Sequence, residues 1–180
     1  MKRVHIIGGK NHGKTKLIEE LIQHFTSHGL RVASIKHTHH HHELDAPGKD
    51  SHRHREAGAC LVGVLSRQMS AVFIPLELAK QVNQDPAALP DEDRYLPFEP
   101  LFSLCDLVLV EGDTGTAAPK VEVWRAAMGT PPRSVGDQSV RAIISDDDAG
   151  AVCSGVPYWS RSDIGQLAQN VLDLVSQSTG

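Results

Sequence analysis

The stretch Gly8-Gly9-Lys10-Asn11-His12-Gly13-Lys14-Thr15 matches the pattern G-x-x-x-x-G-K-[ST], directly follows an apolar run over residues 4–7 and opens an amphipathic segment. Glycines let backbone N–H groups turn toward a polyphosphate, and the following helix adds its positive N-terminal end. In this pattern the lysine, here Lys14, reaches the β- and γ-phosphates, and the hydroxyl, here Thr15, can bind Mg²⁺. We therefore expect all eight residues to bind a nucleotide.

Hydrophobic spacing after this stretch predicts a helix followed by a second strand. Apolar residues recur at helical spacing from Leu17 to Phe25, and Gly29 is expected to end the helix. Residues 32–35 have the pattern of a strand, and the right-handed crossover between the two strands implies a parallel sheet. The predicted fold is a single α/β domain over residues 1–180, of the phosphate-loop NTPase type, with a mostly parallel sheet flanked by helices.

Further elements are expected along the rest of the chain. Runs at residues 60–65 and 71–74 flank a polar turn, which predicts a hairpin or two adjacent strands. A buried parallel strand is expected at residues 107–110, with further strands at 121–124, 142–144 and 156–159. Ser51 is a candidate cap for a short helix that ends near Gly58, and Ser162 or Asp163 is expected to begin the C-terminal amphipathic helix.

Composition narrows the class of protein. The chain has 180 residues, 40% of them hydrophobic, and a net charge of -4, which argues against a general nucleic-acid binder. No window approaches the roughly 18 uninterrupted apolar residues of a membrane span, and no signal-peptide pattern precedes the phosphate loop. We therefore expect a cytoplasmic protein without a membrane partner. The cysteines, which form no C-x-x-C pair, are expected to be reduced core residues: Cys60, Cys105 and Cys153.

Two carboxylates flank the predicted strand at residues 107–110. Glu111 stands at its carboxyl end, where open α/β sheets place ligand-binding groups, so we expect it to hold Mg²⁺ together with Thr15. Asp106 precedes the strand and would lie at the opposite edge, where it is expected to form a cap or an ion pair. Asp146, which follows another predicted strand, could accept hydrogen bonds from guanine N1–H and N2–H, or could cap a helix or loop.

A histidine-rich segment follows the second strand. It begins with His37 and includes the run 39–42, and neutral imidazoles can bind transition metals, although no fixed ligand spacing is present. Contact with an anion or substrate by His37, His39 and nearby Lys49 is the alternative. Asp45 and Lys49 lie in a turn after the second strand, where switch-like loops approach the γ-phosphate, so we expect them to contribute to binding.

These motifs together resemble the MobB family of accessory proteins of molybdopterin-guanine dinucleotide biosynthesis. The phosphate loop is common to many families, whereas the combination of KHTHH, PGKDS and VEG is specific. The matching segments are GGKNHGKT at 8–15, KHTHH at 36–40, DAPGKDS at 45–51, RHREAGA at 53–59, DLVLVEG at 106–112, PKVEVWR at 119–125 and AIISDD at 142–147. The chain departs from the family pattern at Asp113-Thr114, where a bulky residue and a lysine are expected, and at His41-His42.

The resemblance implies a GTP-binding homodimer with weak GTPase activity. Such a protein assists the guanylyltransferase that couples GMP to molybdopterin, and molybdopterin is itself a candidate ligand. The resemblance also supports Gly13, Lys14 and Thr15 as contacts for phosphate and Mg²⁺, and Glu111 as the second carboxylate. Hydrolysis is expected to be slow, because the sequence places no arginine finger beyond the unsupported candidates Arg53 and Arg55.

Three other classes of protein combine a phosphate loop with some of these features. A nickel or zinc metallochaperone GTPase would use the histidine-rich segment, but such proteins usually carry an N-K-x-D motif or a Cys/His site that is not found here. A partitioning-type dimeric ATPase would have a lysine at the position of Gly9. A small-molecule kinase would need an arginine-rich lid, and none is evident.

Overall fold

The computed structural model describes residues 1–38, 44–79, 94–147 and 155–177. The backbone forms two compact units. The first comprises residues 1–38 and 101–180, and the second comprises residues 39–100. The predicted phosphate loop and its candidate metal ligands all belong to the first unit.

A six-stranded sheet forms the centre of the first unit, and all of its neighbouring strands are parallel. The strand order is β2-β5-β1-β6-β7-β8. The strands are β1 (Arg3–Ile7), β2 (Val32–Lys36), β5 (Leu107–Glu111), β6 (Lys120–Val123), β7 (Val140–Ile144) and β8 (Tyr158–Trp159). Every strand expected in this region is present, with ends that differ by one or two residues. Strand β1, which leads into the predicted phosphate loop, lies between β5 and β6.

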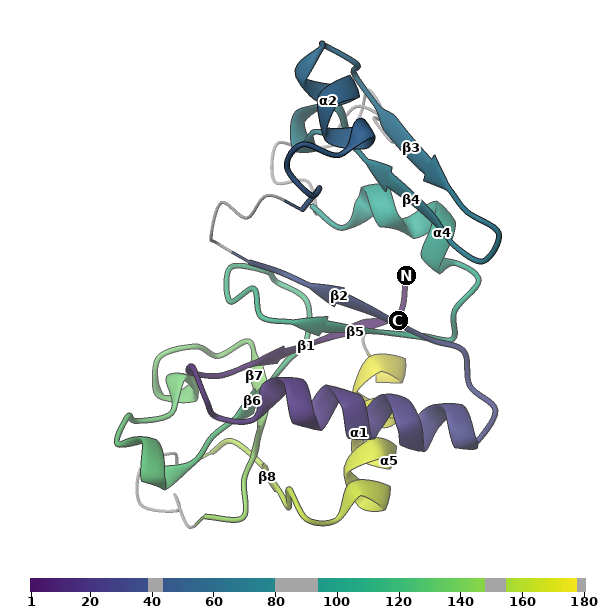
Figure 1. The fold of residues 1–180 in the computed structure, drawn as a ribbon. Helices are drawn as coiled ribbons and strands as arrows, with labels where there is room; N and C mark the ends of the chain where they lie inside the picture. The colour runs from purple at the N-terminus through teal and green to yellow at the C-terminus, as the bar shows by residue number, and fades with distance from the viewer. Residues whose placement is uncertain (39–43, 80–93, 148–154, 178–180) are drawn as a thin grey trace, which may run out of the picture. The chain divides into compact units, whose positions relative to one another are not determined.

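Two amphipathic helices cover one face of this sheet. Helices α1 (Lys14–Ser27) and α5 (Ile164–Gln177) pack side by side, as Figure 1 shows. Their apolar residues form one core with alternate residues of the strands, such as Val4 and Ile6 of β1. Gly29 follows the last turn of α1 with a φ of +83°, as expected of a helix-ending glycine. Asp163 caps α5, because its carboxylate accepts a hydrogen bond from the N–H of Gln166 at 3.0 Å.

The opposite face of the sheet buries polar residues of β6. The Lys120 ammonium donates to Asp137 at 3.2 Å and to the Ser139 hydroxyl at 2.5 Å. The Glu122 carboxylate accepts hydrogen bonds from two backbone N–H groups at the start of the 3₁₀ helix η3 (Arg133–Val135). Both side chains are almost completely buried, so these bonds attach the segment after β6 to the sheet. That segment also contains the 3₁₀ helix η2 (Ala126–Met128).

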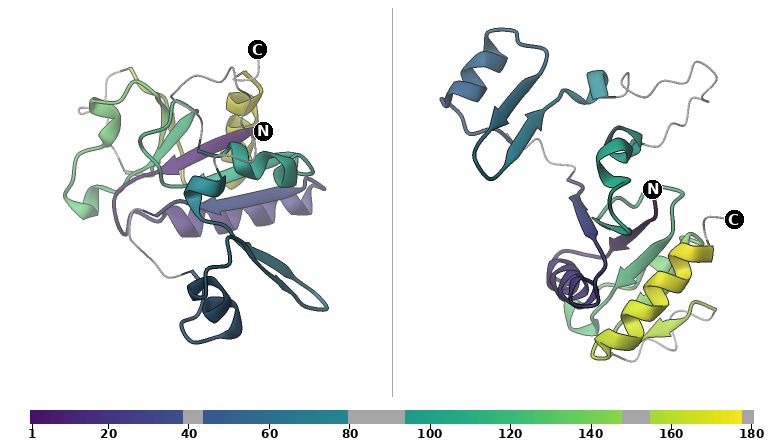
Figure 2. Two further views of the ribbon diagram at one scale, coloured as in Figure 1. Left: turned by 90° about the horizontal axis from the view of Figure 1, so that it is seen from above. Right: turned by 90° about the vertical axis from the view of Figure 1, so that its right-hand side faces the viewer.

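The second unit contains a short helix and an antiparallel hairpin, which confirms the expected hairpin element. Helix α2 (Asp50–Glu56) is followed by β3 (Val62–Leu65) and β4 (Ser70–Phe73), as Figure 2 shows. Ser51 lies inside α2 rather than at its cap, which is Lys49. The hairpin exposes large apolar side chains, among them Leu65 and Met69. Within the described residues that follow, there are three short helices: α3 (Leu76–Ala79), η1 (Leu96–Phe98) and α4 (Glu99–Phe102). The last two residues of α4 belong to the first unit.

The expected burial of the cysteines is wrong for the two that the structure describes. Cys60 is exposed and Cys105 is partly exposed, although both are free thiols as expected. Apolar neighbours in sequence suggested a core position, but Cys60 lies just before the exposed hairpin. Cys153 lies outside the described residues. Among the helices of the described ranges, none is long and apolar enough to cross a membrane.

Candidate functional site

The loop between β1 and α1 has the backbone geometry that its glycines permit. Gly8 has a φ of +143°, and a side chain there would collide with the carbonyl oxygen of Val123 at the end of β6. Gly13, with a φ of +98°, directly precedes the first turn of α1. Because only glycine adopts such angles readily, these two positions explain why the loop can turn sharply into the helix. Lys10 and Asn11 lie exposed between them.

Lys14 lies across the loop that precedes it. Its ammonium group donates hydrogen bonds to the backbone oxygens of Gly8, at 3.0 Å, and Gly9, at 2.7 Å. Partial burial lowers the pKa of Lys14. The carboxylate of Glu111 opposes this effect, and the positive charges of Arg133 and Lys36 add to it. The two hydrogen bonds hold the ammonium over the loop, at the position where the phosphate-loop pattern expects a phosphate ligand.

The two residues expected to hold Mg²⁺ are in direct contact. The Thr15 hydroxyl, in the first turn of α1, donates a hydrogen bond to a carboxylate oxygen of Glu111 at 3.0 Å. The parallel register brings them together, because β5 pairs with β1 so that Glu111 lies opposite Ile6 near the carboxyl end of the sheet. A hydroxyl and a carboxylate oxygen at one point are hard donors of the kind that Mg²⁺ prefers, so these residues fit that ion.

His12 holds the loop to the segment after β6. Its imidazole is buried, its Nδ1 accepts the backbone N–H of Arg125 at 3.1 Å, and its Nε2 lies 3.3 Å from the Thr130 hydroxyl. Burial is the main reason that the pKa of His12 is lowered, and the charge of Lys14 lowers it further. The neutral ring therefore accepts at Nδ1 and donates at Nε2, so the ring is bonded to the protein, which leaves the backbone of His12 as its part in the expected phosphate loop.

Sequence reasoning missed a cation beside the loop. A methyl group placed on Gly13 would lie 2.9 Å from Nη2 of Arg125, so this guanidinium rests against the residue that begins α1. Arg125 lies 113 residues after His12 and is separated from the end of β6 by Trp124 alone. The one signal in the sequence was its position at the carboxyl end of a predicted strand, which becomes informative only once β6 is known to lie beside β1.

Asp146 follows β7, but its carboxylate is already fully engaged. One oxygen accepts the N–H groups of Arg161 and Ser162 and the hydroxyl of Ser160, and the other accepts the Ser162 hydroxyl at 2.5 Å. These bonds, with that of the Ser162 hydroxyl the largest, lower the pKa of Asp146. The carboxylate thus stabilises the turn before α5. Asp106 pairs with Arg31 at 3.2 Å at the opposite edge of the sheet, as expected.

Asp45 and Lys49 belong to the second unit. Asp45 is buried and accepts a hydrogen bond from the Ser51 hydroxyl at 2.8 Å, while Lys49 is exposed before α2. The histidines at 39–42 lie outside the described residues. Among the residues that are described, no three His, Cys, Asp or Glu side chains gather into a metal-binding group. The backbone N–H of His37 donates to the carbonyl oxygen of Glu111, which ties this segment to the end of β5.

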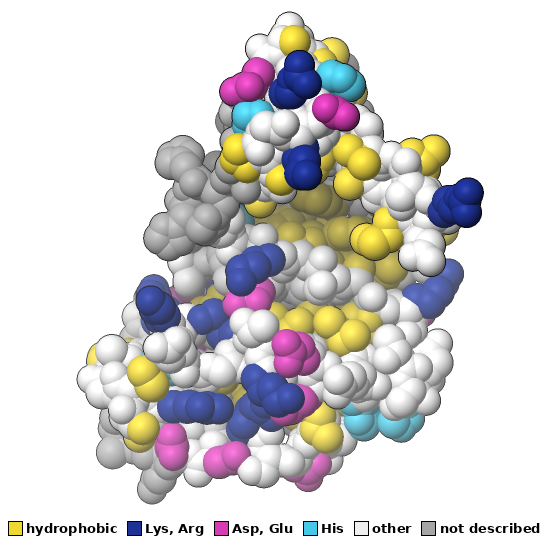
Figure 3. Space-filling model, in the orientation of Figure 1, with side chains coloured by type: hydrophobic (Ala, Val, Ile, Leu, Met, Phe, Trp, Pro, Cys, Tyr) yellow, Lys and Arg dark blue, Asp and Glu magenta, His cyan; other side chains and the backbone are white. Residues whose placement is uncertain are grey.

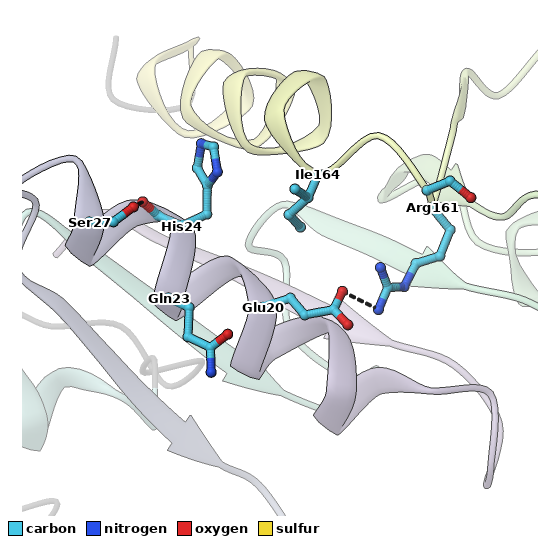
Figure 4. A pocket seen from close by; sticks show the side chains of 7 residues that line it. Glu20, Gln23, His24, Ser27, Arg161 and Ile164 are labelled. Carbon is cyan, nitrogen blue, oxygen red and sulfur yellow. Dashed lines mark hydrogen bonds and ion pairs between the residues drawn. The ribbon is translucent and has the colours of Figure 1, made fainter.

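A hollow elsewhere in the first unit is less suited to an anion than the phosphate loop. It lies between α1 and the start of α5, and Figure 4 shows Arg161 pointing toward Glu20 across it. Their ion pair, at 2.6 Å, neutralises the guanidinium. On the face of the molecule that Figure 3 shows, the basic side chains of the first unit alternate with acidic ones rather than forming a continuous stripe.

The chain is similar to known proteins over most of its length. Residues 3–146 match the profile of the family described as molybdopterin guanine dinucleotide synthesis protein B. The chain is 35% identical to the molybdopterin-guanine dinucleotide biosynthesis adapter protein of Escherichia coli K12, across 93% of this chain and 90% of that one. It is also 35% identical to the adapter protein of the same name from Haemophilus influenzae, across 78% of this chain and 72% of that one.

Solved structures show the same fold at lower identity. A crystal structure of molybdopterin-guanine biosynthesis protein B superposes with a TM-score of 0.66 at 22% identity, and covers 97% of this chain and 99% of that one. A crystal structure of Bacillus subtilis MobB gives a TM-score of 0.64 at 22% identity, and covers 97% of this chain and 98% of that one.

Proposed function

The chain belongs to the molybdopterin guanine dinucleotide synthesis protein B family, and from this membership we propose that it is a GTP-binding adapter. In this role it assists the guanylyltransferase that attaches GMP to molybdopterin, in the cytoplasm, and hydrolyses GTP only slowly. The observation that carries GTP binding is the phosphate loop itself: its glycine geometry, the Lys14 ammonium at its mouth and the contact between Thr15 and Glu111.

Each residue of the loop has a distinct part in this proposal. The backbone from Gly8 to Gly13 surrounds the polyphosphate, and Lys14 exchanges its two carbonyl acceptors for phosphate oxygens. Thr15 and Glu111 hold Mg²⁺, which neutralises charge on the β- and γ-phosphates when bound. Slow hydrolysis is proposed because the sequence places no arginine finger beyond the unsupported candidates Arg53 and Arg55.

The base and pterin contacts are proposed for three further residues. Asp146 is the candidate acceptor for guanine N1–H and N2–H, and it can take this role only by releasing some of its four donors near Ser162. If Asp146 accepts these guanine hydrogen bonds, Asp146→Asn should lower the selectivity for GTP over ATP. Asp45 and Lys49 are proposed to contact the nucleotide or the phosphate of molybdopterin.

We also propose that the protein works as a homodimer. The hairpin of the second unit supports this, because it exposes Leu65, Met69 and Val72 with fractional exposures of 87%, 76% and 66%. Exposed apolar side chains gathered on one element are typical of surfaces that bind another protein. Light scattering after gel filtration should give twice the mass of one chain, and Leu65→Asp should shift the protein toward the monomer. A monomeric wild-type protein would contradict the proposal.

The function is tested by calorimetric titration of the metal-free protein with GTP and with ATP in Mg²⁺, repeated with molybdopterin and with Ni²⁺. Selective GTP binding with affinity for the pterin supports the adapter function. Tight stoichiometric Ni²⁺ binding coupled to the nucleotide would favour the metallochaperone instead. Lys14→Ala is the matched control. It removes the proposed phosphate ligand, whereas helix α1 stays packed against the sheet and α5.

A further inference from the structure

Arg125 is a positively charged group held beside the phosphate loop. Its guanidinium lies against Gly13, and within the described ranges of the chain it meets no carboxylate in hydrogen-bonding or ion-pairing distance. The two carboxylates nearest the loop are occupied elsewhere. Glu111 accepts from Thr15, and Glu122 accepts two backbone N–H groups of η3.

The backbone around Arg125 is fixed from several sides. Its N–H donates to the buried imidazole of His12, and its carbonyl oxygen accepts the N–H of Met128. The indole N–H of the preceding Trp124 donates to the carbonyl oxygen of Thr130 at 2.7 Å. Because the backbone of Arg125 is already fixed, little further backbone entropy is lost when its side chain binds a ligand at the loop.

We propose that Arg125 is a second cation, in addition to Lys14, for the polyphosphate of a nucleotide bound at the phosphate loop. This inference rests on the proposed nucleotide binding and names a residue that acts in it. A guanidinium offers a planar pair of N–H donors that matches two phosphate oxygens, whereas the ammonium of Lys14 acts as a point charge. The same positive charge contributes to the lowered pKa of His12.

The position also accounts for a second constraint on the loop. Gly13 needs a left-handed φ to begin α1, and a side chain there would also occupy the space of the guanidinium. The glycine thus lets Arg125 approach the N-terminus of α1, where backbone N–H groups and the helix dipole already favour an anion. Three sources of positive potential, namely the N-terminus of α1, Lys14 and Arg125, then act on the same bound phosphate.

The test compares the affinities for GTP and GDP of the wild-type protein and four variants, by titration calorimetry in Mg²⁺ at low ionic strength. Arg125→Gln keeps most of the side-chain stem and removes the charge, and Arg125→Lys keeps the charge and removes the planar fork. Arg141→Ala is the control, because it removes an exposed positive charge from the middle of β7. Lys14→Ala reports the loop itself. Thermal unfolding of each variant shows that the fold is kept.

We expect Arg125→Gln to weaken GTP binding by about ten- to a hundredfold, the effect of losing a hydrogen bond to a charged group. Arg125→Lys should recover part of that loss, and Arg141→Ala should bind as the wild type does. Equal affinities of Arg125→Gln and Arg141→Ala, with binding lost in Lys14→Ala, would overturn the role of Arg125 and leave the proposed function standing. A wild-type protein that binds neither nucleotide would overturn both.

Discussion

Replacing Gly8 with alanine should damage the protein far more than the same change at Gly29. Both glycines have a positive φ, +143° and +83°. A left-handed conformation such as that of Gly29 costs alanine about 1–2 kcal/mol, and the φ of Gly8, which lies beyond that region, costs at least as much. They differ in their surroundings. A Cβ at Gly8 would collide with the Val123 carbonyl oxygen, whereas nothing lies within 4 Å of a Cβ at Gly29.

The magnitude follows from these surroundings. At Gly29 the conformational cost is partly offset, by about 0.4–1 kcal/mol, because alanine restricts the unfolded chain, so the net loss is about 1 kcal/mol. At Gly8 a backbone atom of β6 must also move, and forcing extra volume into a packed site costs about 1–3 kcal/mol more. We therefore expect Gly8→Ala to lower the free energy of unfolding by about 2–4 kcal/mol.

Urea denaturation measures both changes. The two tryptophans of the chain, Trp124 and Trp159, lie in the first unit, so their fluorescence reports its unfolding. Gly8→Ala should also weaken GTP binding, because the collision displaces the phosphate loop, and Gly29→Ala should not. Equal losses of unfolding free energy in the two variants would refute the reasoning, since they would mean that β6 does not constrain the loop.

Three other changes follow from the site. Lys14→Ala should remove most of the nucleotide affinity while circular dichroism stays unchanged, and GTP binding at wild-type strength would exclude the assigned site. Glu111→Gln should abolish the increase in GTP affinity that Mg²⁺ produces, whereas an undiminished Mg²⁺ effect would place the ion elsewhere. The lowered pKa of His12 means that the unfolded state binds more protons below its ordinary value of about 6.5. Stability should therefore be complete above pH 6.5 and fall as the pH drops toward the folded pKa; in His12→Gln this part of the pH dependence should disappear, and identical pH curves for the two proteins would contradict it.

The sequence predicts those elements whose signals are local. The first strand, α1 and β2 follow from hydrophobic spacing between residues 4 and 35. Gly29 marks a helix end through its backbone conformation, and Asp163 marks one through its carboxylate. Burial of Lys120 could not be read in this way. In β6, charged residues alternate with apolar ones, which is the pattern of a strand with one exposed face, so Lys120 would be expected on the surface. Only the fold brings Asp137 close enough to pair with it.

The same limit applies to the site. Thr15 and Glu111 were predictable as partners because parallel strands in this class of fold end at a common edge. The orientation of the His12 ring was not, because it depends on the backbone N–H of Arg125, a residue distant in the sequence. Cys60 shows the opposite error, in which apolar neighbours suggested burial and the hairpin left the thiol exposed.

Because β5 pairs with β1 in a fixed register, the apolar residues of β5 determine where Glu111, at the end of the strand, is placed. Leu107 and Leu109 pack toward the helices, while Val108 and Val110 fill the other face, so a slip of one residue would exchange the two faces. Such a slip would carry Glu111 away from Thr15 by the length of one residue. The accuracy of an ion-binding pair is therefore set by side chains that never touch the ion, and damage to that core should be measurable as lost Mg²⁺ dependence as well as lost stability.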